Sequence, residues 1–234
     1  SKDIAYNEKL CKKIGFDIPK IKSVLNKHGL NYSESLLEWH FHIVASISNA
    51  NKLKILEIGT LRGSMTNFIA SVFPNSEVYT IDLPNTDGFN QNLQPKNLSI
   101  LKKDKEKIKK NQIEKKNNLN KNNIFYSEID SFYLHSKFKE NYFDLIFVDG
   151  DHNNPQVTID LFQSYNLCKK GGCIIVDDVV MHNNFQKKHF PEQKIYLFLE
   201  KLVKKGLLDT SYFIQRIYKN NSYNKKFVSY SIKK

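Results

Sequence analysis

A short apolar run that ends in a glycine turn constrains the fold of this chain more than any other feature. The run Ile55-Leu56-Glu57-Ile58 leads into Gly59-Thr60-Leu61-Arg62-Gly63-Ser64, which has two glycines four positions apart. An apolar run of this length in front of a helix-like segment is typical of a buried parallel strand that feeds a helix. Glycine at the turn allows a positive φ and lets a ligand approach the backbone, because it has no Cβ.

The spacing Glu-x-Gly-x-x-x-Gly narrows the choice of ligand. It is neither the Gly-x-Gly-x-x-Gly of dinucleotide-binding proteins nor a phosphate-binding loop that ends in Gly-Lys-Ser or Gly-Lys-Thr. A dinucleotide-dependent oxidoreductase is therefore the least favoured enzyme class. From the turn alone, a ligand-binding loop and a purely structural strand–helix connection stay equally open.

Strand-like and helix-like segments alternate through the rest of the chain. The predicted strands are residues 54–58, 77–81, 124–127, 143–148 and 173–176, the last one after a Lys-Lys-Gly-Gly turn at 169–172. The predicted helices between and after them are residues 64–72, 155–167 and 191–205. Two β-rich runs, 211–218 and 226–232, then predict a hairpin. This order of elements predicts an α/β fold with a doubly wound sheet.

The first 50 residues are predicted to be an N-terminal helical cap, and residues 51–234 the α/β domain. Helices are expected at residues 19–26 and, with Ser33 as N-cap, at residues 34–49.

Two histidines, His40 and His42, lie on the second of these helices. They are two positions apart, so they do not share a helix face. We therefore expect solvated or core-edge histidines rather than a pair of ligands.

A lysine- and asparagine-rich insertion separates the second and third predicted strands. Residues 83–123 contain no strand pattern, whereas connections between a strand and a helix are usually short. Within the insertion, Ile100 to Asn117 has dense lysine and few apolar residues. We favour a solvated helix followed by a loop. The alternative is a basic segment that handles an acidic or phosphorylated substrate.

Acidic residues follow three of the predicted strands. Asp149-Gly150-Asp151-His152 follows one, Asp177-Asp178 another, and Asp82 ends the strand at 77–81. In an open α/β sheet, ligands bind outside the carboxyl ends of the strands. An acidic residue about 20 positions beyond the glycine turn is where a ribose diol is hydrogen-bonded. The alternative for Asp82 is a helix N-cap.

The doubled acidic pairs predict a cation. Carboxylates brought close together repel one another unless a positive charge lies between them. Mg²⁺ prefers oxygen ligands in octahedral geometry and keeps positions open for water or substrate. Capping of the following segments by single aspartates is the structural alternative, and the doubled pairs fit it poorly.

These motifs resemble a known enzyme family over about residues 50–180. The runs Phe143 to His152 and Gly171 to Asp178, with the Glu57 to Gly63 turn, are similar to the class I S-adenosylmethionine (SAM) dependent methyltransferases. Within that class they resemble the bacterial small-molecule O-methyltransferases, among them the Mg²⁺-dependent sugar O-methyltransferases of macrolide and aminocoumarin biosynthesis. The resemblance implies a Rossmann-like seven-stranded sheet with a C-terminal antiparallel hairpin, SAM as cofactor, and Mg²⁺ or another divalent cation.

The resemblance also implies a role for each matching residue. Asp149, Asp177 and Asp178 are implied as metal ligands, and Asp151 as the general base. His152 departs from the sugar-type motif and leaves the base open between Asp151 and His152. The residues implied to contact SAM are Glu57, Gly59, Thr60, Gly63, Ser64, Asp82, Glu128, Asp130 and Asp149.

Composition limits the binding partners and the cellular compartment that we expect for this chain. The net charge of +12 is spread over lysines throughout the chain, so a nucleic-acid partner is not expected. No apolar run of about 18 residues predicts a membrane span, and the first ten residues lack a signal-peptide pattern. Three cysteines, Cys11, Cys168 and Cys173, without metal-type spacing indicate a reduced, cytoplasmic setting.

The leading hypothesis is therefore a SAM- and Mg²⁺-dependent O-methyltransferase that acts on a hydroxyl of a small molecule, a sugar or a glycosylated metabolite. One alternative is a metal-independent methyltransferase on RNA or another macromolecule, which only the basic insertion supports. Another is a non-catalytic protein with the SAM-binding fold. The acceptor and the oligomeric state, a homo-oligomer included, stay open.

Overall fold

The computed structural model describes residues 2–32, 38–48, 50, 52–83, 109–181, 194–217 and 225–234. These residues form a seven-stranded sheet in the order β3-β2-β1-β4-β5-β7-β6. The strands are β1 Lys54–Ile58, β2 Glu77–Asp82, β3 Ile124–Glu128, β4 Phe143–Val148, β5 Cys168–Val180, β6 Leu208–Ile217 and β7 Lys225–Lys233. Neighbours from β3 to β5 pair in parallel, and β7 is antiparallel to β5 and β6. The Rossmann-like fold and its C-terminal hairpin are confirmed.

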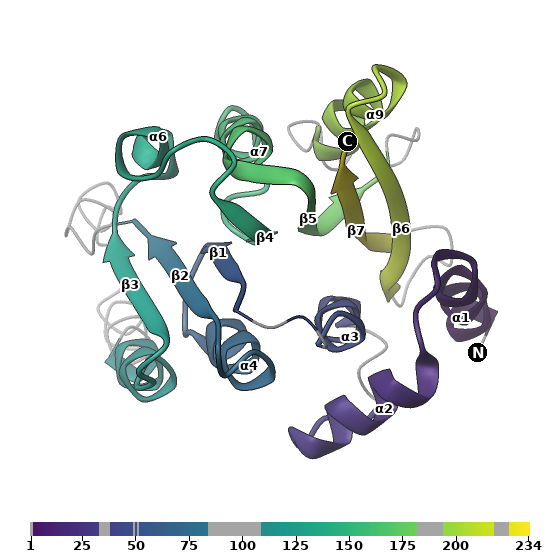
Figure 1. Ribbon diagram of the computed structural model, residues 1–234, viewed down its shortest axis with the longest axis horizontal. Helices are drawn as coiled ribbons and strands as arrows, with labels where there is room; N and C mark the ends of the chain where they lie inside the picture. Colours follow the sequence, from purple (N-terminus) through teal and green to yellow (C-terminus); the bar gives the residue numbers. More distant parts are fainter. Residues whose placement is uncertain are drawn as a thin grey trace, which may run out of the picture.

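Helices cover both faces of this sheet (Figure 1). One face carries α1 Lys2–Ile14, α2 Ile18–Lys27, α3 Trp39–Ser46 and α4 Ser64–Val72. The other carries α6 Leu134–Lys137, preceded by the short 3-10 helix η3 Ser131–Tyr133, with α7 Gln156–Leu167 and α9 Ile195–Lys204. A further helical segment, residues 109–118, belongs to the insertion. No helix among the described residues is long and apolar enough to cross a membrane.

Strand β4 shows why the sheet needs both layers. Leu145 and Phe147 enter the core beneath α1 to α4, whereas Ile146 and Val148 enter the core beneath α7 and α9. Successive side chains of a strand point to opposite faces, so an uninterrupted apolar strand must be covered twice. The central strands are therefore buried between two layers of helices, and their carboxyl ends form one edge of the sheet.

The strand β5 is longer than predicted at both ends. The predicted turn at 169–172 lies within it as a bulge, because the register jumps from Phe143 opposite Cys168 to Leu145 opposite Cys173. Beyond Val176 the strand leaves β4 and continues to Val180 along β7. Asp177 and Asp178 therefore lie in a second bulge inside β5, between two stretches paired with β7, and not after the strand's end.

The histidines of α3 are buried, so the expectation of solvated or core-edge positions is wrong. The exposed fraction is 7% for His40 and 0% for His42. His42 stacks on the Trp39 ring at 4.3 Å between centroids, and burial lowers the pKa of His42 to about 4. His40 instead lies 5.6 Å from the Phe147 ring of the sheet. The predicted N-cap Ser33 lies outside the described residues.

Candidate functional site

The turn after β1 packs backbone against backbone on the end of β4. Gly59 has a φ of +100°, and a Cβ on it would lie 2.2 Å from the carbonyl oxygen of Asp149. The amide N–H groups of Gly59 and Thr60 both donate to the carbonyl of Ile81, at 3.0 and 3.1 Å. The amide of Asp149 donates to the carbonyl of Ile58 at 2.9 Å. Only glycine fits here, and the ends of β1, β2 and β4 are held together.

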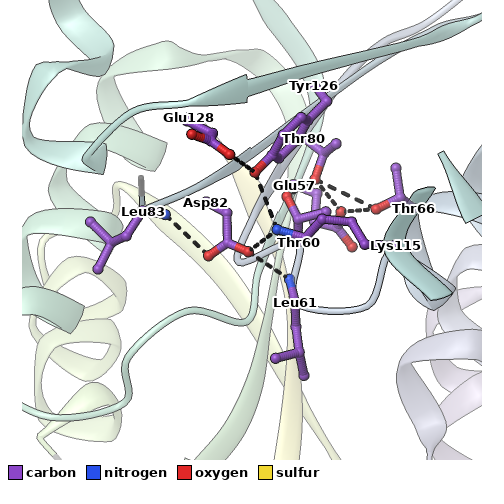
Figure 2. A network of polar contacts seen from close by, with 10 residues as sticks. All are labelled: Glu57, Thr60, Leu61, Thr66, Thr80, Asp82, Leu83, Lys115, Tyr126 and Glu128. Carbon is purple, nitrogen blue, oxygen red and sulfur yellow. Dashed lines mark hydrogen bonds and ion pairs between the residues drawn. The ribbon is translucent and has the colours of Figure 1, made fainter. Parts of the chain in front are cut away.

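The carboxylate of Glu57 lies buried beneath this turn (Figure 2). The hydroxyls of Thr66 and Thr80 both donate to its Oε2. The Thr80 hydroxyl donates its only hydrogen to Glu57. In the 2.6 Å contact between the hydroxyls of Thr60 and Thr80, Thr60 is therefore the donor. Burial raises the pKa of Glu57 to about 8, although the two threonine hydrogen bonds oppose the rise. Hydrogen bonds through Glu57 and Thr60 thus connect the turn to β2 and α4.

Asp82, at the end of β2, holds the turn from the other side (Figure 2). Its Oδ2 accepts from the amide of Leu61 at 3.0 Å and from the ammonium of Lys115 at 2.8 Å. Its Oδ1 accepts from the amide of Leu83 at 3.1 Å. The carboxylate is thereby fixed at the mouth of the turn.

A cavity of about 460 Å³ opens at this edge of the sheet. Five of the sequence-predicted residues line it, namely Gly59, Asp82, Asp149, Asp151 and His152. Its other lining residues are Ile58, Leu61, Ile81, Leu83, Ile129, Ser131, Gly150, Gln156 and Asp160. This volume is within the usual range for small-molecule sites. A second cavity, of about 540 Å³, lies between α6 and α7 and contains none of the predicted residues.

His152 stands between two of the carboxylates. Its Nε2 lies 3.5 Å from Oδ1 of Asp149 and 3.9 Å from Oδ2 of Asp178. Burial alone would lower the pKa of His152, but these carboxylates outweigh it and raise the pKa above its ordinary value. Burial raises the pKa of Asp149, and His152 opposes that rise. The three groups form one electrostatic unit at the cavity.

Protein cations also meet the acidic pair of β5. Nδ1 of His40 lies 3.7 Å from Oδ1 of Asp177, and the Lys226 ammonium contacts Oδ2 of Asp178. Burial would raise the pKa of Asp177, but His40 outweighs it and holds the pKa below its ordinary value. Each carboxylate therefore has a positively charged or chargeable neighbour from a distant part of the chain.

This arrangement does not fit a divalent ion. The Lys226 ammonium contacts Oδ2 of Asp178 and repels a second cation nearby. Among the residues that the structure describes, no group of three or more His, Cys, Asp or Glu side chains is placed to hold a metal. The cation expected from the sequence has its counterpart in Lys226, His40 and His152.

Comparison with known proteins places the chain in a family. Residues 56–179, more than half of the chain, match the model of the methyltransferase domain family. The chain belongs to the class I SAM-dependent methyltransferases. No curated protein matches the sequence.

Solved structures share the fold of this methyltransferase. The O-methyltransferase of Bacillus cereus in complex with S-adenosylhomocysteine (SAH) has 16% sequence identity and a TM-score of 0.56, with 98% of this chain and 97% of that chain covered. TomG of Streptomyces achromogenes, involved in tomaymycin synthesis and in complex with SAM, has 13% identity and a TM-score of 0.54, with 98% and 96% covered. The fibrillarin pre-rRNA processing protein of Methanococcus jannaschii has 16% identity and a TM-score of 0.52, with 80% and 69% covered.

The remaining predicted residues of the methyltransferase lie around the cavity rather than on its wall. Gly63, with a φ of +72°, and Ser64 begin α4. Asp130 caps η3 by accepting from the amide of Phe132 at 2.8 Å, and Glu128 accepts from the hydroxyl of Tyr126 at 3.3 Å. Glu128 is the last residue of β3, and Glu128 and Asp130 stand on either side of the lining residue Ile129 in the chain.

Asp160 of α7 is a cavity residue that sequence reasoning missed. It is 1% exposed, and burial raises its pKa to about 6, although the hydrogen bonds from Ser131 and Gln156 oppose the rise. The hydroxyl of Ser131 donates to its Oδ1, and the side-chain amide of Gln156 donates to the same oxygen at 3.0 Å. The sequence signal was an aspartate among the apolar residues of a predicted helix, beside Leu161.

The buried Glu57 predicts an unusual pH dependence of stability. An unfolded glutamate has a pKa of about 4.3, and the folded value is about 8. Between these values the folded state binds more protons than the unfolded one, so the free energy of unfolding falls as pH rises through this window. Glu57→Gln keeps the oxygen that accepts from both threonines and removes this fall.

Urea denaturation at several pH values between 4.5 and about 8 measures the difference. The free energy of unfolding of Glu57→Gln, minus that of the wild type, should rise steadily as the pH approaches the upper value. Glu140→Gln, at an exposed position, serves as the control. A difference in unfolding free energy that stays constant over this pH range would show that Glu57 is ionised throughout.

Proposed function

We propose that this methyltransferase transfers the methyl group of SAM to a hydroxyl of a small molecule, and that the acceptor is a sugar or a glycosylated metabolite. The cavity that extends from Gly59 and Asp82 to Asp149 and His152 carries this proposal. It brings a glycine turn, a strand-end carboxylate and a carboxylate-bound histidine to one wall. Two O-methyltransferases in complex with SAM or SAH, similar over nearly their whole length, support it.

In this proposal the cavity divides into cofactor and acceptor regions. The turn of residues 59–64 holds the methionine part of SAM, with Asp149 beside it. Asp82 holds the ribose, and the adenine lies toward Ser131, close to Glu128 and Asp130. Glu57 acts indirectly, because it supports the turn from beneath and does not line the cavity.

The chemistry needs positioning and a base. Methyl transfer from a sulfonium is an in-line displacement, so the alignment of the acceptor oxygen supplies much of the acceleration. A sugar hydroxyl is a weak nucleophile until its proton is removed. We assign His152 as the general base, because Asp149 and Asp178 hold its ring and stabilise the imidazolium that forms.

Asp151 is the second candidate for the base. Its Oδ1 accepts from the amide and from the side chain of Asn153, at 2.9 and 3.0 Å. These bonds close a turn ahead of α7. Its carboxylate lines the cavity too, but His152 has the closer carboxylate partners, and we favour it.

The predicted Mg²⁺ is not part of this proposal. With Lys226 on Asp178 and His40 beside Asp177, the charges that a metal would balance are balanced by the chain itself. Every step above is performed by residues of the protein. We therefore propose metal-independent transfer in place of the sequence-based prediction.

A macromolecular acceptor is the alternative. The fibrillarin pre-rRNA processing protein shares the fold, and the chain has a net charge of +12. We favour a small molecule because the candidate site is a cavity of about 460 Å³ lined by acidic rather than basic side chains. The three cysteines are buried free thiols, which fits the proposed cytoplasmic setting.

Methyl-labelled SAM tests the proposal with a panel of glycosides and nucleotide sugars as acceptors. Label should appear in a methyl ether that survives mild base, and His152→Gln should lower kcat by about 10²- to 10⁴-fold while SAH binding is unchanged. His135→Gln, an exposed histidine outside this cavity, is the control. Label in RNA alone would contradict a small-molecule acceptor, and full activity of His152→Gln would move the base to Asp151.

Chelation tests the metal-independent part. EDTA should leave the transfer rate unchanged, and millimolar Mg²⁺ should not shift the thermal unfolding temperature, since a ligand that binds only the folded state would raise it. Lys226→Ala should expose Asp178 and introduce such a shift. Activity that is lost in EDTA and restored by Mg²⁺ would instead support the sequence-based prediction of a metal enzyme.

A further inference from the structure

The helix of residues 109–118 from the basic insertion is attached to the glycine turn. The Arg62 guanidinium lies 3.6 Å from the Glu114 carboxylate, and the Asn118 side chain donates to the Arg62 carbonyl at 2.8 Å. A Cβ on Gly63 would lie 3.1 Å from the Leu119 side chain. The described part of the insertion is thus in contact with the proposed cofactor region and is not a freely solvated helix.

One lysine of this helix reaches the strand-end carboxylate (Figure 2). Nζ of Lys115 lies 2.8 Å from Oδ2 of Asp82 and donates to the hydroxyl of Tyr126 at 3.2 Å. The lysine side chain is 15% exposed and the aspartate side chain 29%. Burial alone would lower the pKa of Lys115, but the bonds to Asp82 and Tyr126 raise it above its ordinary value. The contact is shielded from solvent on the lysine side.

The described hydrogen bonds to Asp82 are distributed unequally over its two oxygens. A carboxylate has about four acceptor positions, two on each oxygen. Among the residues that the structure describes, Oδ2 accepts from the backbone amide of Leu61 and from Lys115, and Oδ1 accepts from the backbone amide of Leu83. Asp82 lines the cavity, and Lys115 does not. The ammonium therefore binds Asp82 without lining the cavity, and within the described part of the chain Oδ1 keeps an acceptor position for a ligand.

We propose that Lys115 is a positioning residue of the ribose subsite, and that the helix of residues 109–118 supports the cofactor pocket from outside. This inference rests on the proposed SAM-dependent function. Lys115 acts through Asp82, because together with the Leu61 amide it occupies Oδ2 and holds the carboxylate in one orientation. Oδ1 then accepts a hydrogen bond from a ribose hydroxyl of SAM or SAH. The lysine serves the cofactor, and not an acidic or phosphorylated substrate.

Calorimetric titration with SAH and with its 2′,3′-dideoxy analogue tests this role. The wild type should bind SAH more tightly than the analogue. Lys115→Met should raise the Kd of SAH by roughly tenfold, as for loss of a hydrogen bond between charged groups, and change the Kd of the analogue much less. Lys116→Met, its exposed neighbour on the same helix, removes the same charge and should match the wild type. Lys115→Arg should restore most of the affinity.

Each other outcome has a distinct meaning. Equal weakening of both ligands by Lys115→Met would show a general packing role and overturn the inference, as would agreement between Lys115→Met and Lys116→Met. Lys115→Gln, with the same expectation, replaces Lys115→Met if that variant does not fold. If the wild type bound neither ligand, the proposed function itself would fail, whereas binding that ignores Lys115 would refute this inference alone.

Discussion

The buried carboxylate of Glu57 is the interaction on which the site depends. It lies beneath the turn after β1 and takes hydrogen bonds from Thr66 of α4 and Thr80 of β2. Thr60 of the turn is joined to the same chain through Thr80. Burial makes the ionised form of this group costly, and the raised pKa of Glu57 reflects that cost. The cost is offset where the carboxylate ties a strand, a helix and a turn into one arrangement.

The close approach of Gly59 to Asp149 couples the position of the turn to the position of the proposed catalytic residues. Because no Cβ separates the two backbones, the position of the turn sets the position of the β4 end. Asp149 and His152 follow directly from that end, and His40 and Lys226 neutralise the neighbouring acidic pair. The site is therefore a set of carboxylates whose charges are balanced by residues that the fold brings from α3, β7 and the loop after β4.

The local sequence pattern was sufficient to predict those elements whose structure depends on local interactions. The strand 143–148 and the helix 64–72 were predicted with their observed bounds, because an uninterrupted apolar strand and an amphipathic segment after a glycine turn have few alternatives. The extension of β5 to Val180 was missed, since it depends on pairing with Phe227 and Lys226 about 50 residues later. Contacts such as Lys115 with Asp82 or His40 with Asp177 join distant segments, and no spacing rule reveals them. Asp160 was missed for a different reason: the helix of residues 155–167 was predicted as an element, without asking which of its residues face the sheet edge.

The central claim is that the edge of the sheet formed by Gly59, Asp82 and Asp149 is a SAM pocket. Calorimetric titration of SAH into the wild type and into Asp82→Ala tests it most directly. The wild type should bind one SAH per chain at micromolar concentration, and Asp82→Ala should bind at least about tenfold more weakly, since it loses a hydrogen bond to a charged group. Absence of binding by the wild type, or equal binding by the two proteins, would contradict the account.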